Sequence, residues 1–189
     1  PTLTIRELDQ ELVLILSNTE PTEKYEGKDP ALAINGVDSL FKFQGYKIFQ
    51  LKDGSINQAD VVDISNLQDK AQLLFTVDYK DGVKSITNYK YNPVTKTYDG
   101  KVMVNGTDNG ISHTFKITQD AFAKGEKQLV NFKTYWFLVV PYAYNNWQQF
   151  DIDSIFKNSQ LLPYIEGSSA KLSGIPHKTL GGISAAYGD

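Results

Sequence analysis

The chain has 189 residues and a formal net charge of −3, with 41% hydrophobic and 22% charged residues. This composition supplies enough apolar material for the core of a globular domain, and its acidic balance argues against nucleic acid as a partner. The absence of Cys excludes disulfides, thiolate metal ligands and a thiol nucleophile. The longest unbroken apolar run, Trp136–Val140, is far shorter than a membrane span, so membrane insertion is not expected.

Apolar and polar residues alternate with a period of two between turn signals along most of the chain, which predicts an all-β structure. Aromatic residues, at 12% of the sequence, also favour strands. Turn sequences such as Asp53-Gly54 and Asp81-Gly82 separate the segments. The expected strands span residues 2–8, 11–16, 39–51, 71–79, 83–91, 98–104, 112–118 and 134–144.

Several segments depart from this alternation. Residues 18–38 are polar and predict a long loop, and residues 56–69 predict one helical turn. Thr118–Ala123 begins with a capping residue and predicts a short helix that Gly125 ends. Pro141 has no N–H for a strand ladder, so we expect a bulge or a sheet edge there. Since helical periodicity persists nowhere, no helix longer than about three turns is expected.

Short strands separated by turns predict a β-sandwich with long loop insertions. We assign this domain to residues 1–166. Gly, Ser and Ala accumulate from Gly167 to Asp189, which predicts a linker or the start of another domain. The chain begins at Pro1 without a Met or a signal peptide, so we expect it to be part of a larger protein.

Two segments resemble strands of fibronectin type III domains. Phe43–Phe49 (FQGYKIF) is similar to strand C of that family, and Leu129–Phe137 (LVNFKTYWF) is similar to the approach to strand F. The resemblance implies a fibronectin-III/immunoglobulin-like β-sandwich, in which Glu11–Leu16 is strand B without the Trp that the family often has there. It also implies that Tyr135 forms the tyrosine corner, with its hydroxyl bonded to nearby backbone.

Longer stretches resemble a domain of very large Bacteroidota surface proteins associated with type IX secretion. These stretches are KFQGYKIFQLKD, VNGTDNGISHTF, LVNFKTYWFLVVPYAYN and the late IPH. The resemblance implies a secreted or cell-surface parent protein, with neighbouring domains of the same chain as partners. The expected function is a non-catalytic structural or spacer module.

Aromatic residues concentrate in the last long strand and the loop that follows it. Alternate residues of a strand share a face, so Trp136, Tyr142 and Tyr144 are expected on one side. Together with Trp147 they form a candidate surface for binding a polysaccharide or another surface protein. The alternative is that loops or a neighbouring domain bury this row.

No residue pattern predicts catalysis or a cofactor. His113 and His177 lie in separate segments, which argues against a zinc site. Asp53–Asn57 resembles a calcium loop, but its Gly is misplaced and the terminal Glu is missing, so structural Ca²⁺ is a minor alternative to a plain turn. Asp151 and Asp153 are paired carboxylates of the kind that glycosidases use, although solvated loop acids are the simpler interpretation. We therefore expect no enzymatic activity.

Overall fold

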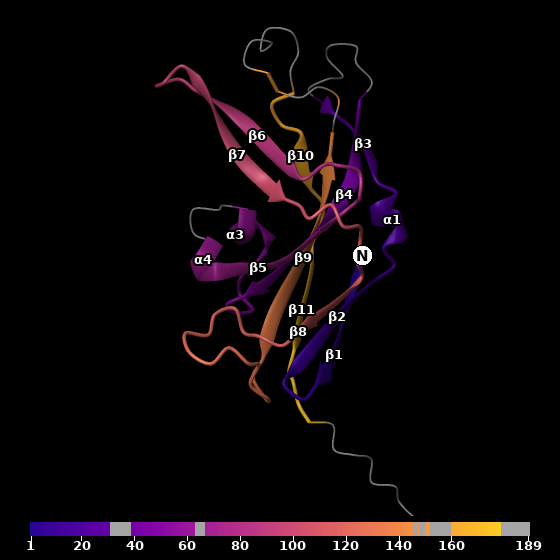
Figure 1. Cartoon of the computed structure of the whole chain (residues 1–189), viewed down its shortest axis with the longest axis vertical. Helices are drawn as coiled ribbons and strands as arrows, with labels where there is room; N and C mark the ends of the chain where they lie inside the picture. Colours follow the sequence, from indigo (N-terminus) through magenta and orange to yellow (C-terminus); the bar gives the residue numbers. More distant parts are fainter. Residues whose placement is uncertain (31–38, 63–66, 146, 148–149, 152–159, 179–189) are drawn as a thin grey trace, which may run out of the picture.

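The computed structural model describes residues 1–30, 39–62, 67–145, 147, 150–151 and 160–178 (Figure 1). Within these residues the fold is all-β with antiparallel sheets, as predicted. The strands are β1 (Thr2–Leu8), β2 (Glu11–Ser17), β3 (Glu26–Lys28), β4 (Leu40–Leu51), β5 (Ala71–Asp78), β6 (Ser85–Asn92), β7 (Thr97–Asn105), β8 (Thr114–Ile117), β9 (Tyr135–Tyr144), β10 (Tyr164–Glu166) and β11 (Ala170–Gly174). The described helices are α1 (Glu20–Glu23), α3 (Gln58–Val62) and α4 (Leu67–Lys70).

These helices are four or five residues long. In the part of the chain that the structure describes, no helix has the length and apolar character needed to span a membrane.

Two sheets share the main core. The first has the strand order β1-β2-β8, and the second is built on the central pair β4 and β9. Strands β3 and β5 pair with one edge of β4, while β10 and β11 pair with the far edge of β9. Hairpin β6–β7 forms a separate two-stranded sheet that projects from the second sheet (Figure 1). The core between the two large sheets contains Leu3, Leu12, Leu14, Leu16, Phe43, Tyr46, Ile48, Phe115, Ile117, Leu129, Tyr135, Phe137 and Val139.

Strand β9 is buried on both faces, as its nearly continuous apolar sequence YWFLVVPYAY favours. Phe137 and Val139 contribute to the core between the two large sheets. Leu138 and Val140 belong to a second cluster, which includes residues of helix α3 and the turn before it. Tyr142 packs in a third cluster under the β6–β7 hairpin. The central sheet is therefore covered on one face by a sheet and on the other by a helix and a hairpin.

Pro141 coincides with a break in the edge strand beside β9. Strand β10 pairs with residues 142–144 and β11 with residues 135–139, so the position without an N–H faces the gap between them. In that gap the Gly167 N–H donates to the Pro141 carbonyl at 2.8 Å. On its other side β9 pairs with β4 through Pro141 without interruption. The predicted irregularity at Pro141 is confirmed.

The helix predicted over Thr118–Ala123 is wrong, because this segment forms a turn. The buried carboxylate of Asp120 accepts hydrogen bonds from the Phe122 N–H at 2.9 Å and the Gln50 amide at 2.7 Å, and it pairs with Lys133 at 2.7 Å. Burial opposes ionisation of Asp120, but these three donors lower the pKa of its carboxyl below the ordinary value. The acid thus anchors the turn to β4, and residues 121–125 form no helix.

Two other predicted boundaries also need correction. The sandwich was assigned to residues 1–166, but Ala170–Gly174 forms β11 and pairs with β9. The second sheet therefore extends to Gly174, and only residues 179–189 of the predicted linker lie outside the described residues. The predicted loop over residues 18–38 contains helix α1 and strand β3 in its described part. The remainder of that prediction, residues 31–38, lies outside the described residues.

A buried ion pair joins β4 to the edge strand β10. The Lys47 ammonium lies 2.8 Å from Glu166 Oε1, and both side chains are largely buried. The Tyr164 hydroxyl donates to the same oxygen at 2.7 Å, and the Gln58 amide donates to the other at 3.3 Å. Burial alone would raise the pKa of Glu166, but the charge and hydrogen bond of Lys47, with these two donors, lower it below the ordinary value.

This lowered pKa predicts how the free energy of unfolding depends on pH. Glu166 contributes stability above its unfolded-state pKa, and that contribution is lost as the pH falls through the lower folded-state pKa. We expect the free energy of unfolding of the parent to fall more steeply from neutral pH to about pH 3 than that of Glu166→Gln. Urea titrations at a series of pH values measure both slopes.

The exposed Glu126 provides the matched control. Glu126→Gln should keep the parent slope. Equal slopes for the parent and Glu166→Gln would show that the ion pair does not govern acid stability.

Candidate functional site

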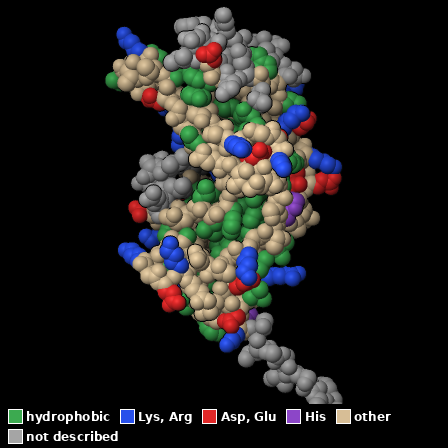
Figure 2. All heavy atoms as spheres, in the orientation of Figure 1, with side chains coloured by type: hydrophobic (Ala, Val, Ile, Leu, Met, Phe, Trp, Pro, Cys, Tyr) green, Lys and Arg blue, Asp and Glu red, His purple; other side chains and the backbone are tan. Residues whose placement is uncertain are grey.

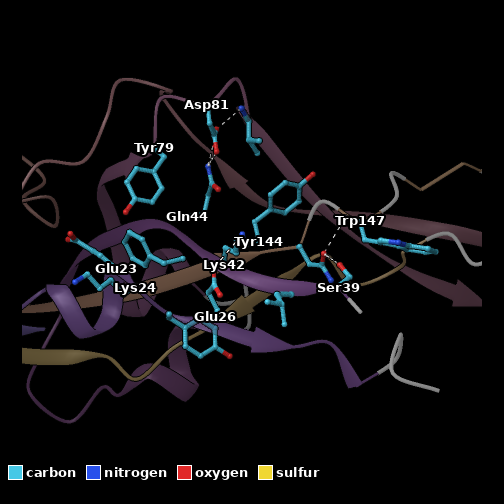
Figure 3. Close-up of a pocket in the computed structure, with 15 residues that line it drawn as sticks. Glu23, Lys24, Glu26, Ser39, Lys42, Gln44, Tyr79, Asp81, Tyr144 and Trp147 are labelled. Atoms are coloured by element: carbon cyan, nitrogen blue, oxygen red, sulfur yellow. Dashed lines mark hydrogen bonds and ion pairs between the residues drawn. The ribbon is translucent and has the colours of Figure 1, made fainter. Parts of the chain in front are cut away.

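A groove of about 610 Å³ opens at the edge of β4, between the start of β3 and the end of β5 (Figure 3). Strand β3 pairs with residues 40–42 of β4, and β5 pairs with residues 45–51. Between them the Phe43 N–H donates to the Tyr25 carbonyl at 3.2 Å, and the Tyr79 N–H donates to the Gln44 carbonyl at 3.0 Å. Tyr25 and Tyr79 therefore approach β4 from opposite ends of the same gap.

The groove combines aromatic rings with polar groups. Its aromatic residues are Tyr25, Phe43, Tyr79, Tyr144 and Trp147. Its ionisable and amide residues include Glu23, Lys24, Glu26, Lys42, Gln44 and Asp81. A concave surface with this mixture of groups is typical of small-molecule and oligosaccharide sites.

The floor of the groove is an aromatic stack supported from the core. The Phe43 ring lies 4.9 Å from the buried Tyr46 ring and 5.6 Å from the Tyr79 ring, which it meets edge to face. The Tyr46 hydroxyl donates to Glu23 at 3.1 Å, and His113 Nε2 lies 2.6 Å from the same Glu23 oxygen. Burial and then the Glu23 carboxylate raise the pKa of Tyr46 above its ordinary value. Helix α1 is thus tied to the second sheet through Glu23.

One wall of the groove is formed by Asp81 in the turn after β5. Both carboxylate oxygens of Asp81 accept from the Gln44 amide, at 3.1 and 3.0 Å, and one also accepts from the Val83 N–H at 3.0 Å. Asp108 holds the turn from behind, because its Oδ1 accepts the N–H groups of Asp81 and Gly82 at 2.9 Å each. Figure 3 shows the Gln44–Asp81 contact beside Tyr79. The carboxylate therefore has a fixed position at the rim.

A buried carboxylate behind this wall fixes the facing turn. Asp78 Oδ1 accepts from the N–H groups of Thr107 and Asp108, at 3.1 and 2.9 Å. A Cβ on Gly106 would lie 1.7 Å from Asp78 Oδ2, so the Asn105-Gly106 turn requires glycine for this approach. The two turns at residues 78–82 and 105–110 thus brace each other.

The predicted aromatic binding surface does not exist as one face. Tyr142 is only 1% exposed and packs in the core under the β6–β7 hairpin. Trp136 is half-buried against the second cluster and lies over Gly54. Tyr144 and Trp147 do line the groove, so two of the four predicted residues meet there. The alternative of burial by loops applies to Trp136 and Tyr142, since the helix and hairpin insertions cover that side of β9.

Tyr135 occupies the position expected of a tyrosine corner. Its side chain is 2% exposed, and its hydroxyl accepts a hydrogen bond from the Val130 N–H at 2.9 Å. This geometry agrees with the prediction that the hydroxyl bonds to main chain in the preceding segment. The Lys133 ammonium lies 5.0 Å from the ring centroid and covers it from outside.

The candidate metal and acid residues are separate. His113 contacts Glu23, whereas His177 contacts Ile175 and Glu7. Asp53 Oδ1 accepts from the N–H and hydroxyl of Ser55, which is a simple Asx turn. Across the described ranges, no group of three or more His, Asp or Glu could hold a metal ion. Asp153 lies outside the described residues, so its pairing with Asp151 stays a prediction.

Sequence reasoning missed the centre of the groove, namely Tyr25, Tyr79 and Asp81. One signal was present, since Asp81 belongs to the predicted Asp81-Gly82 turn, Tyr79 shortly precedes it, and Tyr25 lies in a Pro- and Gly-containing segment. Comparisons with protein-family models, curated proteins and solved structures find no match to this chain.

Two tyrosines that are equally buried should respond differently to loss of the hydroxyl. Tyr135→Phe removes a hydrogen bond and leaves the Val130 N–H without its partner, so we expect it to cost about 1 kcal/mol of unfolding free energy. The buried Tyr142 hydroxyl has no partner among the described residues. Tyr142→Phe should therefore leave stability within about 0.5 kcal/mol of the parent or raise it.

Urea denaturation of both variants measures the difference. A Tyr135→Phe variant as stable as the parent would contradict the assignment of the tyrosine corner.

Proposed function

We propose that this chain is a non-catalytic structural module of a larger exported cell-surface protein, with a fibronectin-III/immunoglobulin-like β-sandwich fold. In this role it spaces and displays neighbouring domains of the same chain. The order of strands in the two large sheets supports the fold part of this proposal, and the exported location rests on the sequence resemblance described above.

The order β1-β2-β8 in the first sheet corresponds to strands A, B and E of an immunoglobulin-like sandwich. In the second sheet β4 and β9, followed by the edge of β10 and β11, correspond to strands C, F and G. Strand β5, beside β4, takes the position that strand C′ has in variable-type domains. This correspondence supports the sandwich assignment.

The position of the tyrosine corner adds support from a different kind of observation. In immunoglobulin-like domains this Tyr lies near the start of strand F, and Tyr135 is the first residue of β9. The segments that depart from the simple plan are β3, the helices α3 and α4, and hairpin β6–β7. Under the proposed fold these segments are the long insertions expected from the sequence.

The proposed location is tested on intact cells of the source organism. Antiserum raised against this chain should detect a polypeptide longer than 189 residues, and the signal should disappear when intact cells are treated with proteinase K. A cytosolic marker protein, protected under the same treatment, controls for lysis. Detection of the antigen only in the protected cytosolic fraction would contradict the proposal.

A further inference from the structure

The groove at the β3/β5 gap presents exposed aromatic rings that are held in place. Tyr25 is 42% exposed and Tyr79 is 39% exposed. A Cβ on Gly27 would lie 2.0 Å from the Tyr25 hydroxyl, so the absence of a side chain at Gly27 lets the Tyr25 ring lie close to the backbone. The Tyr79 ring is held edge to face by the buried Phe43. Rigid rings lose little conformational entropy when a ligand stacks on them.

Fixed hydrogen-bonding groups lie beside these rings. The Asp81 carboxylate is exposed at the rim, and its orientation is set by Gln44, which is 5% exposed. A carboxylate has about four acceptor positions, and Asp81 uses three of them for Gln44 and Val83. Glu26 adds a second exposed carboxylate to the lining. The fixed Asp81 carboxylate can therefore bind a hydroxyl group without rearrangement of the protein.

The charges of the lining largely compensate one another. The lining contains three carboxylates, Glu23, Glu26 and Asp81, and two ammonium groups, Lys24 and Lys42, and Glu26 pairs with Lys42 at 3.4 Å. Figure 2 shows acidic and basic side chains interspersed on the visible face, with no broad area of either sign. A groove without a strong net field has little means of selecting a highly charged ligand such as a nucleic acid.

We propose that this groove binds a neutral oligosaccharide, or a short stretch of a neutral polysaccharide. The apolar C–H faces of the sugar rings stack on Tyr25 and Tyr79, while the hydroxyl groups donate to Asp81 and Glu26. The volume of about 610 Å³ lies in the range of small-ligand sites. This inference goes beyond the proposed structural role and does not depend on it, because binding is measured on the isolated chain and location on intact cells.

The test is affinity electrophoresis of the full 189-residue chain in native gels. The gels contain laminarin, barley β-glucan, xylan or galactomannan, with polygalacturonate and heparin as anionic polymers. We expect retardation by at least one neutral polysaccharide and a weaker effect or none from the anionic polymers. No retardation by any neutral polysaccharide overturns the proposal, and stronger retardation by an anionic polymer overturns it in favour of an anion-binding surface.

Variants then locate the site. Tyr79→Ala and Tyr25→Ala should each weaken the affinity by at least about tenfold, because each removes one stacked ring. Asp81→Asn keeps an acceptor for Gln44 and Val83 but loses the charge, so we expect a smaller loss. The matched control is Tyr91→Ala, since Tyr91 is 48% exposed on hairpin β6–β7 and does not line the groove.

Thermal unfolding of each variant separates binding from folding. If Tyr79→Ala fails to fold because its ring packs on Phe43, Tyr25→Ala decides the question, since Tyr25 belongs to none of the core clusters. Folded Tyr25→Ala with the parent affinity overturns the assignment of the groove. The same is true if Tyr91→Ala weakens binding as much as the groove variants do.

Discussion

Burial of the central pair β4 and β9 on both faces is the constraint on which the rest of this structure depends. A pair of long strands with apolar side chains on both faces must be covered twice, because either face left in water would expose a large hydrophobic surface. The sheet β1-β2-β8 covers one face, while helix α3 and hairpin β6–β7 cover the other. The helical and hairpin insertions are therefore part of the core. The same burial explains why Lys47, which lies on β4, has Glu166 as a close partner, since a buried charge without one is strongly destabilising.

The edges of strands β4 and β9 determine where the groove and a second cavity form. On one edge of β4, the pairing with β9 shifts register between Phe43 and Gly45. Along the opposite edge of β4, the pairing with β3 stops at Lys42 and the pairing with β5 starts at Gly45. On β9 the edge strand is interrupted at Pro141, where β10 gives way to β11. Each interruption is accompanied by a hollow: the groove lies at the first, and a second cavity of about 460 Å³, lined in part by Pro141 and Gly167, lies at the second. Breaks in backbone pairing thus position the surfaces available to ligands.

The strands could be predicted well from the sequence because period-two alternation and turn dipeptides are local signals. β1, β4 and β9 lie within a residue of their expected bounds, and the irregularity at Pro141 follows from its missing N–H. The bond between the Tyr135 hydroxyl and the preceding backbone was expected only from the resemblance to fibronectin type III domains. Short edge strands such as β10 and β11 were missed, because their five or fewer residues rest on pairing with distant β9 and carry little pattern of their own. The helix predicted after Thr118 failed because a buried tertiary partner, Gln50, engages Asp120.

The groove illustrates why sites are harder to predict from sequence than strands. Alternation along β9 correctly separates the two faces of the strand, but it contains no information on what covers each face. Alternation predicts the Tyr142 and Tyr144 side chains on the same face of β9. The hairpin formed by residues 85–105 nevertheless buries Tyr142, while Tyr144 lines the groove. The rings of the groove include Tyr25 and Tyr79, which are 54 residues apart in the sequence and line it together because both flank one gap on β4. Because Tyr25 lies outside the core clusters, a substitution at Tyr25 alters the lining of the groove without removing a core side chain.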